Sequence, residues 1–279
     1  MRFPAALLAL LLPVHPLPAE TLKINGSTTV NLPAAEAAEI LRAERKLDIQ
    51  VDTQGGSSGG VSMLGDGLVQ IGMLSRHVND DDRAKYPAVK FREIQIGEDA
   101  VALIVSRDVW DGGVHALTQQ QIKDIYESKI TNWQDVGGKP QRIAFFNKEP
   151  GRGTWEVFAH WAYGNPKAAP QVSFPEVGGN EETRNKVGST RGALSQLSAS
   201  WADGRKIFAL GIKREDGTVV DPTNENIANQ KYPLSRSLLL LTNGEPTGVA
   251  RTYVDFMLSD RGQDLVKKHG YLRLKDLSK

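Results

Sequence analysis

Residues 22 to 30 read Leu22-Lys23-Ile24-Asn25-Gly26-Ser27-Thr28-Thr29-Val30. The spacing of Leu22 and Ile24 predicts a short strand over residues 22–24, which ends in a loop of glycine and hydroxyl residues. A helix over residues 34–47 follows, with Pro33 suited to its first turn and Ile40 facing a core. This order of strand, hydroxyl-rich loop and helix is the unit from which we predict the fold.

The same unit occurs twice more with different residues. Gly55-Gly56-Ser57-Ser58-Gly59-Gly60 follows a predicted strand at 48–52, and Pro150-Gly151-Arg152-Gly153-Thr154 separates a strand at 142–146 from a helix at 155–163. Four glycines in six residues are costly in backbone entropy, which indicates a main chain that must approach something closely. Neither loop, nor the first, fits the GxxxxGK[ST] or GxGxxG patterns of nucleotide-binding loops.

Each loop would place unpaired N–H donors, hydroxyl groups and the positive end of a helix dipole at one point, which is a ready anion site. One such loop alone is explained as well by helix capping. Three of them in one chain can converge from two sides on a compact tetrahedral oxyanion.

Elsewhere, predicted strands also alternate with helical patterns, which indicates an α/β fold with a mainly parallel sheet covered by helices. No repeat or linker divides the chain into sequential domains, so two lobes would have to interleave. The remaining predicted strands lie at 69–72, 101–105 and 238–241, and the remaining helices at 61–64, 119–127 and 248–258.

The composition excludes several functions. Of 279 residues, 34 are Lys or Arg and 33 are Asp or Glu, a balance that argues against nucleic-acid binding and against a polybasic membrane patch. The chain has no cysteine, which excludes disulfides, thiolate metal sites and a lipid anchor on cysteine. Its five histidines are far apart in the sequence, and we expect neither a metal site nor a cofactor.

The first 19 residues have the layout of a secretory signal peptide. A positive start at Arg2 precedes an unbroken apolar run over residues 5–12, and Leu17-Pro18-Ala19 stands before the polar chain. The run is too short for a permanent transmembrane helix. We therefore expect an exported, periplasmic protein that is not lipid-anchored.

Three cations near the loops are candidate anion ligands. Arg152 lies in the third loop, Lys148 precedes it by four residues, and Arg76 follows Ser75 beyond the strand at 69–72. The planar guanidinium fork matches an oxyanion better than an ammonium group does. The run from Asp80 to Arg83 is interpreted as a solvated helix start.

At these residues the chain resembles the periplasmic phosphate-binding proteins of phosphate ABC transporters, the PstS family of the type II solute-binding superfold. The resemblance covers residues 21–274. Its most specific stretches are Gly26-Ser27-Thr28-Thr29-Val30, Gly72-Met73-Leu74-Ser75-Arg76, Ile130-Thr131-Asn132-Trp133, Val136-Gly137-Gly138, Tyr232-Pro233-Leu234-Ser235-Arg236, Leu258-Ser259, Gly262-Gln263 and Gly270-Tyr271. The segments at Trp133 and Tyr232 are interpreted as packing and turn residues.

The resemblance implies two α/β lobes that hold phosphate in the cleft between them and hand it to an ABC permease in the inner membrane. One lobe would comprise residues 20–103 and 235–279 and the other residues 104–234, joined near 101–106 and 234–241. It also implies a monomer without enzymatic activity. The phosphate ligands that it carries over by motif are Ser27, Thr28, Thr29, Ser57, Ser58, Ser75, Gly153 and Thr154.

Two departures from the family pattern leave the anion open. Lys148 stands where many relatives have arginine, and Arg152 precedes Gly153-Thr154 where relatives have serine. Ser75 stands where some relatives have an aspartate that accepts the phosphate proton.

Sulfate and molybdate therefore remain alternative ligands, and a sensing or adhesion role built on the same cleft remains an alternative to transport. An exported phosphatase with Ser57 or Thr154 as nucleophile is a further alternative. It would need a base or a metal within reach, and no cluster of Asp, His and Glu with ligand spacing lies near the loops.

Overall fold

The computed structural model describes residues 21–168 and 173–277. The predicted signal peptide lies outside these residues. The strands are β1 (Leu22–Gly26), β2 (Ile49–Asp52), β3 (Ile71–Leu74), β4 (Phe91–Ser106), β5 (Ala116–Thr118), β6 (Ala144–Lys148), β7 (Glu176–Val177), β8 (Ala193–Ser198), β9 (Ile207–Ala209), β10 (Gly211–Lys213), β11 (Val219–Val220) and β12 (Ser235–Asn243).

Helices alternate with these strands over most of the chain, which confirms the α/β class. They are α1 (Thr28–Arg45), α2 (Gly56–Gly65), α3 (Asp80–Lys85), α4 (Arg107–Trp110), α5 (Gln119–Tyr126), α6 (Gly153–Tyr163), α7 (Asn180–Ser189), α8 (Asn224–Ala228), α9 (Gly248–Leu258) and α10 (Asp260–Lys268), with short 3₁₀ turns η1 (Trp133–Val136), η2 (Ala199–Trp201) and η3 (Leu274–Asp276).

One nine-stranded sheet runs through the molecule in the order β2-β1-β3-β12-β4-β8-β6-β7, with β9 on β4. Two runs of it are parallel, β2-β1-β3 and β8-β6-β7, as the strand–helix alternation predicts. Strands β4 and β12 are antiparallel to their neighbours. The sheet as a whole is therefore mixed, because β12 and β4, which join its two parallel runs, are antiparallel to each other and to the strands on either side.

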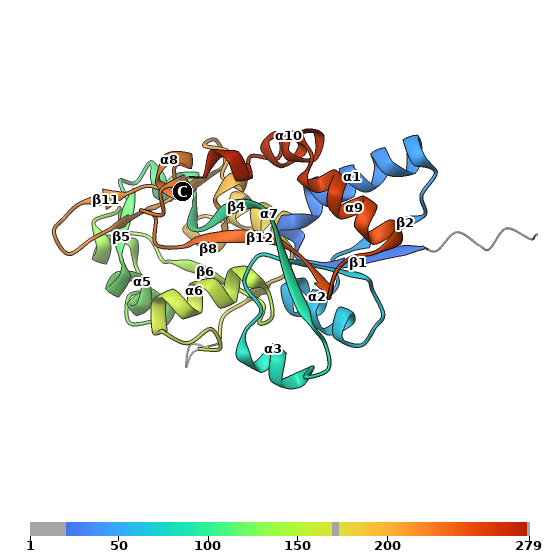
Figure 1. Ribbon diagram of the computed structural model, residues 1–279. Coiled ribbons are helices and arrows are strands. Elements are labelled where there is room, and N and C mark those ends of the chain that lie inside the picture. The colour runs from blue at the N-terminus through green and yellow to red at the C-terminus, as the bar shows by residue number, and fades with distance from the viewer. Residues whose placement is uncertain (1–20, 169–172, 278–279) are drawn as a thin grey trace, which may run out of the picture.

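The long strand β4 passes from one lobe into the other. Its first part, up to Ala100, pairs with β12, and its second part, from Val101, pairs with β8 and β9. Figure 1 shows α1, α9 and α10 gathered at one end of the molecule and β5, β11 and α5 at the other. We call the end with β1 and β12 the first lobe and the end with β6 and β8 the second lobe.

Each lobe has apolar cores on both faces of its sheet. In β12, Leu238 and Leu240 contact the core under α1 and α9, whereas Leu239 and Leu241 contact the core under α2. The second half of β4 alternates in the same way between two cores of the second lobe. These runs are continuous in sequence because helices cover both sides of the sheet. Trp133 and Tyr232 are buried in the second lobe, as expected of packing residues.

Two predicted helix starts were wrong. Helix α1 begins at Thr28, because the Ser27 hydroxyl caps it by accepting from the Thr29 N–H, so Pro33 lies inside the helix rather than in its first turn. Helix α2 begins at Gly56, so the second glycine-rich segment is mostly helix and not loop. A side chain at Gly60 would meet the Asn25 and Met73 carbonyl oxygens at 2.9 and 3.0 Å. The close approach that the glycines permit is therefore to the chain's own strands.

Replacement of Gly26 by alanine should destabilise the fold strongly. Gly26 has a φ of 144°, and a Cβ there would lie 2.2 Å from the Met73 carbonyl oxygen of the neighbouring strand. We expect Gly26→Ala to lower the free energy of unfolding by roughly 3 kcal/mol, measured by urea denaturation. The control is Gly67→Ala, which also has positive φ but an empty surrounding and should cost about 1 kcal/mol. Equal losses in both variants would contradict the packing argument.

Candidate functional site

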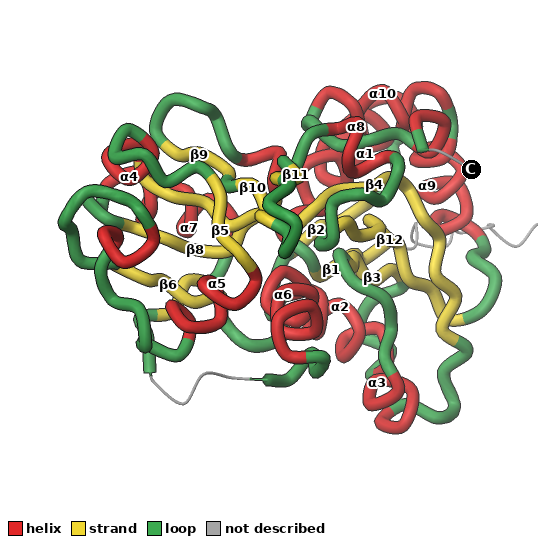
Figure 2. The backbone as a smooth tube through the Cα atoms, turned by 90° about the vertical axis from the view of Figure 1, so that its left-hand side faces the viewer, coloured by secondary structure: helices red, strands yellow, loops and turns green. Residues whose placement is uncertain are grey.

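The starts of α1, α2 and α6 meet around one small polar cavity between the lobes. Helices α2 and α6 lie side by side (Figure 2). The cavity is lined by Ser27, Thr28, Thr29, Gly56, Ser57, Ser75, Lys148, Arg152, Gly153, Thr154, Gly178 and Asn180. All three predicted segments thus contribute to it, although they lie up to 127 positions apart in the sequence.

Three serine hydroxyls form the floor of the cavity. Ser75 Oγ lies 3.0 Å from Ser27 Oγ and 3.4 Å from Ser57 Oγ, and the Ser75 N–H donates to Ser57 Oγ at 3.1 Å. All three residues are buried. Hydroxyl groups can donate as well as accept, so this floor can turn its hydrogens toward a bound anion.

Arg236 is a site residue that the sequence reasoning did not select. Its guanidinium donates to the hydroxyls of Thr154, at 2.9 Å, and of Thr29, at 3.3 Å. It forms a buried pair with Asp99, with Nε at 3.1 Å and Nη2 at 2.8 Å from the same carboxylate oxygen. Ser198 Oγ donates to the other Asp99 oxygen. The sequence signal that could have identified it was an arginine two residues before the apolar run Leu238–Leu241.

Lys148 also lines the cavity and is fully buried. Its Nζ donates to the Gly178 and Gly179 carbonyls, at 2.8 and 3.2 Å, and to the Thr183 hydroxyl at 2.5 Å. These bonds hold the turn before α7, from which Asn180 reaches Thr29 Oγ1 at 3.1 Å. Burial, and then the positive charges of Arg152 and Arg236, lowers the pKa of Lys148 to about 7.

Arg152 stands at the rim of the cavity. It is the residue before the first turn of α6, and its side chain is 18% exposed. Its Nε and Nη2 donate to one oxygen of Glu149, at 3.0 and 2.7 Å. The charge of Arg152 is therefore already partnered within its own loop.

Ser58 and Arg76, both predicted anion ligands, are not among the residues that line the cavity. Ser58 Oγ donates to Glu156 Oε1 at 2.9 Å and accepts from Arg76 Nη2 at 3.0 Å. Arg76 also pairs with Glu156 and with Asp82. The other nine predicted site residues do meet at the cavity.

The charges around the cavity leave a local positive excess. Arg236 is balanced by Asp99 and Arg152 by Glu149, while Lys148 has no ion-pair partner among the residues that the structure describes. No Asp, Glu or His is among the described residues that line the cavity. The arrangement of helix starts, hydroxyls and one unbalanced cation is suited to holding a small anion.

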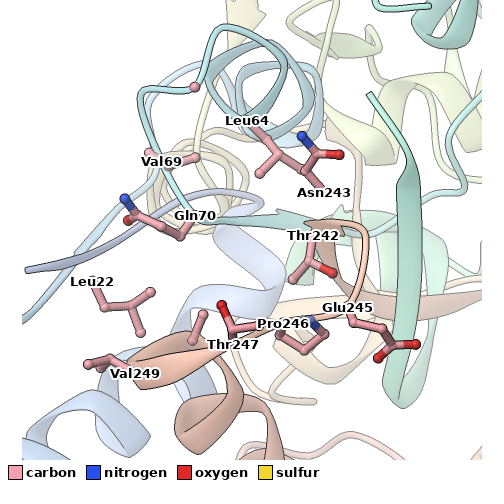
Figure 3. Close-up of a pocket in the computed structure, with 12 residues that line it drawn as sticks. Leu22, Leu64, Val69, Gln70, Thr242, Asn243, Glu245, Pro246, Thr247 and Val249 are labelled. Carbon is pink, nitrogen blue, oxygen red and sulfur yellow. The ribbon is translucent and has the colours of Figure 1, made fainter. Parts of the chain in front are cut away.

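Another pocket, on the first lobe, lacks these features. Figure 3 shows Leu22, Thr247 and Val249 on one side of it and Leu64 and Asn243 on another. Its only charged lining residue in the described chain is Glu245, which would repel an anion.

The described residues hold no group of three or more His, Asp or Glu side chains that could bind a metal ion. Between residues 21 and 277, outside the gap at 169–172, no helix is both long enough and apolar enough to cross a membrane.

Protonation of Lys148 should leave a measurable pH signature in the stability of the free protein. Because its folded pKa, about 7, lies below the value near 10.4 of an unfolded lysine, the unfolded chain binds more protons between these values. The free energy of unfolding should therefore rise with pH from about 7 to 10, by up to about 1.4 kcal/mol per unit from this group.

Lys148→Met should lack this contribution, and Lys139→Met, at an exposed position of the same lobe, should retain it. The measurement is urea denaturation at pH 7, 8 and 9. Parallel pH profiles for wild type and Lys148→Met would show that Lys148 stays charged throughout.

Known proteins resemble this chain over nearly its whole length. A sequence profile described as PBP superfamily domain matches residues 14–261. The phosphate-binding protein PstS of Bacillus subtilis is 30% identical over 259 residues, which cover 92% of this chain and 82% of the relative. The PstS of Borreliella burgdorferi is 27% identical, and the match covers 90% of this chain and 89% of the relative.

A solved structure agrees with the fold. A candidate phosphate ABC transporter substrate-binding protein with bound phosphate, from Clostridium perfringens, superposes with a TM-score of 0.80 at 30% identity, covering 91% of this chain and 100% of the other. The match of sequence profile, full-length relative and fold means that the chain belongs to the PstS family of the PBP superfamily.

Proposed function

We propose that this protein binds inorganic phosphate in the cavity between its lobes and delivers it to an ABC permease for import. The observation that carries this proposal is the convergence of the α1, α2 and α6 starts with buried hydroxyls and an unbalanced Lys148. Each helix start supplies N–H donors and a positive dipole end to the anion. The phosphate-binding relatives named above support the choice of anion.

The residues proposed to touch phosphate are those that line the cavity. Ser27, Thr28, Thr29, Ser57, Ser75, Gly153 and Thr154 would donate hydroxyl or backbone hydrogens, with Lys148 and Arg152 as flanking cations. Arg236 donates to Thr154 and Thr29, which orients both hydroxyls and leaves their own hydrogens free for an anion. Ser58 and Arg76 have no proposed contact with phosphate, because they do not line the cavity.

We propose that the protein has no catalytic activity. A phosphatase that used Ser57 or Thr154 as nucleophile would need a base close to that hydroxyl. The lining that the structure describes contains no carboxylate and no imidazole. Absence of turnover with an aryl phosphate ester would support this assignment.

We further propose that the lobes comprise residues 20–103 with 235–279 and residues 104–234, and move about β4 and the start of β12. The protein would be a monomer in the periplasm, exported by a signal peptide at 1–19. Light scattering would test the monomeric state, and the mass of the mature chain would test removal of the signal peptide.

Phosphate should stabilise the folded protein. A ligand at a hundredfold excess over its dissociation constant adds about 2.7 kcal/mol to the free energy of unfolding. The measurement is thermal unfolding of anion-free protein with phosphate, sulfate, arsenate or molybdate, supported by calorimetric titration. Thr154→Val, which keeps the shape but removes a lining hydroxyl, should show a smaller shift with phosphate. No shift with millimolar phosphate would contradict the proposed ligand.

Discrimination against sulfate should be weak and should improve on replacement of Ser75 by aspartate. Phosphate at neutral pH still carries a proton and sulfate does not, so a lining carboxylate would accept from phosphate and repel sulfate. No residue in the described lining supplies one. We expect excess sulfate to reduce phosphate binding by wild type more than by Ser75→Asp. Wild type that ignores sulfate would show that another group accepts the phosphate proton.

A further inference from the structure

A second buried cluster of charges lies across the lobe boundary, beside the anion cavity. Glu156, on α6 of the second lobe, contacts Arg76 and Ser58 of the first lobe. Arg76 Nε lies 2.6 Å from Glu156 Oε2, an ion pair rather than an aligned hydrogen bond, and Ser58 Oγ donates to Glu156 Oε1 at 2.9 Å. The side chains of Arg76 and Glu156 are 6% and 8% exposed.

Glu156 cannot serve as an anion ligand. It is a carboxylate, which would repel phosphate, and it does not line the cavity. It follows Thr154 by two residues in α6, and each residue of a helix turns the side-chain direction by about 100°. Thr154 therefore faces the cavity while Glu156 faces away from it, toward Arg76.

The contact depends on charge. Burial raises the pKa of Glu156, and the positive charge of Arg76 opposes that rise. A carboxylate buried at this point is stable as an anion only while Arg76 is beside it. With the lobes in contact, Arg76 therefore offsets part of the cost of burying the Glu156 charge.

Arg76 is held in place by its own lobe. It pairs with Asp82, and Asp82 forms a reciprocal cap with Asn79 at the start of α3, with both bonds between 2.9 and 3.1 Å. If the lobes separate, Arg76 stays paired with Asp82, and the Glu156 carboxylate becomes hydrated. Opening therefore leaves no buried charge unpaired, which makes the contact reversible.

We propose that Glu156 is a positioning residue that latches the lobes together through Arg76 and Ser58, and so sets how fast a bound anion leaves. The identity of that anion rests on the proposed function, whereas the latch between the lobes does not. Removal of one partner of a buried charge pair acts mainly on the dissociation rate.

The test compares wild type with Glu156→Gln, which keeps the size of the side chain and loses its charge. Radiolabelled phosphate bound to each protein is chased with unlabelled phosphate in a rapid-mixing experiment. We expect release to be roughly tenfold faster in the variant, with the association rate and the ratio of phosphate to sulfate affinity unchanged. An unchanged release rate, or a change confined to association or to that ratio, would overturn the latch.

A matched control is the exposed ion pair between Lys167 and Asp81, which also joins the second lobe to the first. Its side chains are 62% and 67% exposed, and an exposed pair contributes little. Lys167→Met should therefore release phosphate at the wild-type rate. Equal acceleration in Lys167→Met and Glu156→Gln would contradict a specific role for Glu156.

A double-mutant cycle separates the latch from direct anion binding by Arg76. If Arg76 acts through Glu156, Arg76→Gln should speed release in wild type and add little in the Glu156→Gln background. If Arg76→Gln lowers phosphate affinity as much in the Glu156→Gln background as it does in wild type, Arg76 is a ligand instead. Ser58→Ala, a smaller change, gives the same comparison if Arg76→Gln does not fold.

Failure of the proposed function would be visible separately, as absence of phosphate binding by wild type. The latch is then tested in the free protein by fluorescence energy transfer between dyes on Arg42→Cys and Lys139→Cys. Both positions are exposed, one in each lobe, and the chain has no native cysteine. The closed fraction should fall in Glu156→Gln, and an equal closed fraction in both proteins would overturn the latch.

Discussion

The buried pair of Asp99 and Arg236 is the interaction on which the rest of the site depends. The two residues stand directly opposite each other on β4 and β12, next to the point where β4 passes into the second lobe. The guanidinium has hydrogens left over after pairing, and these reach Thr29 in the first lobe and Thr154 in the second. Loss of either partner would leave an uncompensated buried charge, which costs about 3–5 kcal/mol. The pair therefore fixes both the position at which β4 passes between the lobes and the orientation of the Thr29 and Thr154 hydroxyls.

The cavity around this pair is suited to an anion although the side chains near it carry little net charge. Helix dipoles and hydroxyl groups supply most of the donors, and the two arginines near it are already balanced by carboxylates. Lys148 adds the remaining positive charge, and its lowered pKa shows how much its burial opposes that charge. A site filled with unbalanced arginines would disfavour the anion-free protein through mutual repulsion. The observed arrangement avoids that repulsion and still leaves an electrostatic preference for an anion.

Local sequence patterns predicted the three segments that meet at the cavity, because strand, hydroxyl-rich segment and helix are contiguous in each, although the starts of α1 and α2 were predicted several residues too late. They did not predict Arg236, since its role comes from strand pairing across 137 positions with Asp99. They also selected Ser58 and Arg76, which do not line the cavity. Gly56–Gly65 forms a helix, so consecutive Ser57 and Ser58 point in different directions, and only Ser57 lines the cavity. Ser75 and Arg76 are neighbours just past β3, and only Ser75 lines the cavity.

The proposed anion ligands and the proposed latch lie on adjacent residues. Ser57 and Ser75 face the cavity, whereas their neighbours Ser58 and Arg76 face Glu156. In α6, Thr154 faces the cavity and Glu156 the latch. An anion that orders Ser57, Ser75 and Thr154 therefore orders the backbone that carries all three latch residues. Phosphate binding and lobe closure would then be coupled over one or two residues of chain, and no longer pathway through the protein is needed to connect them.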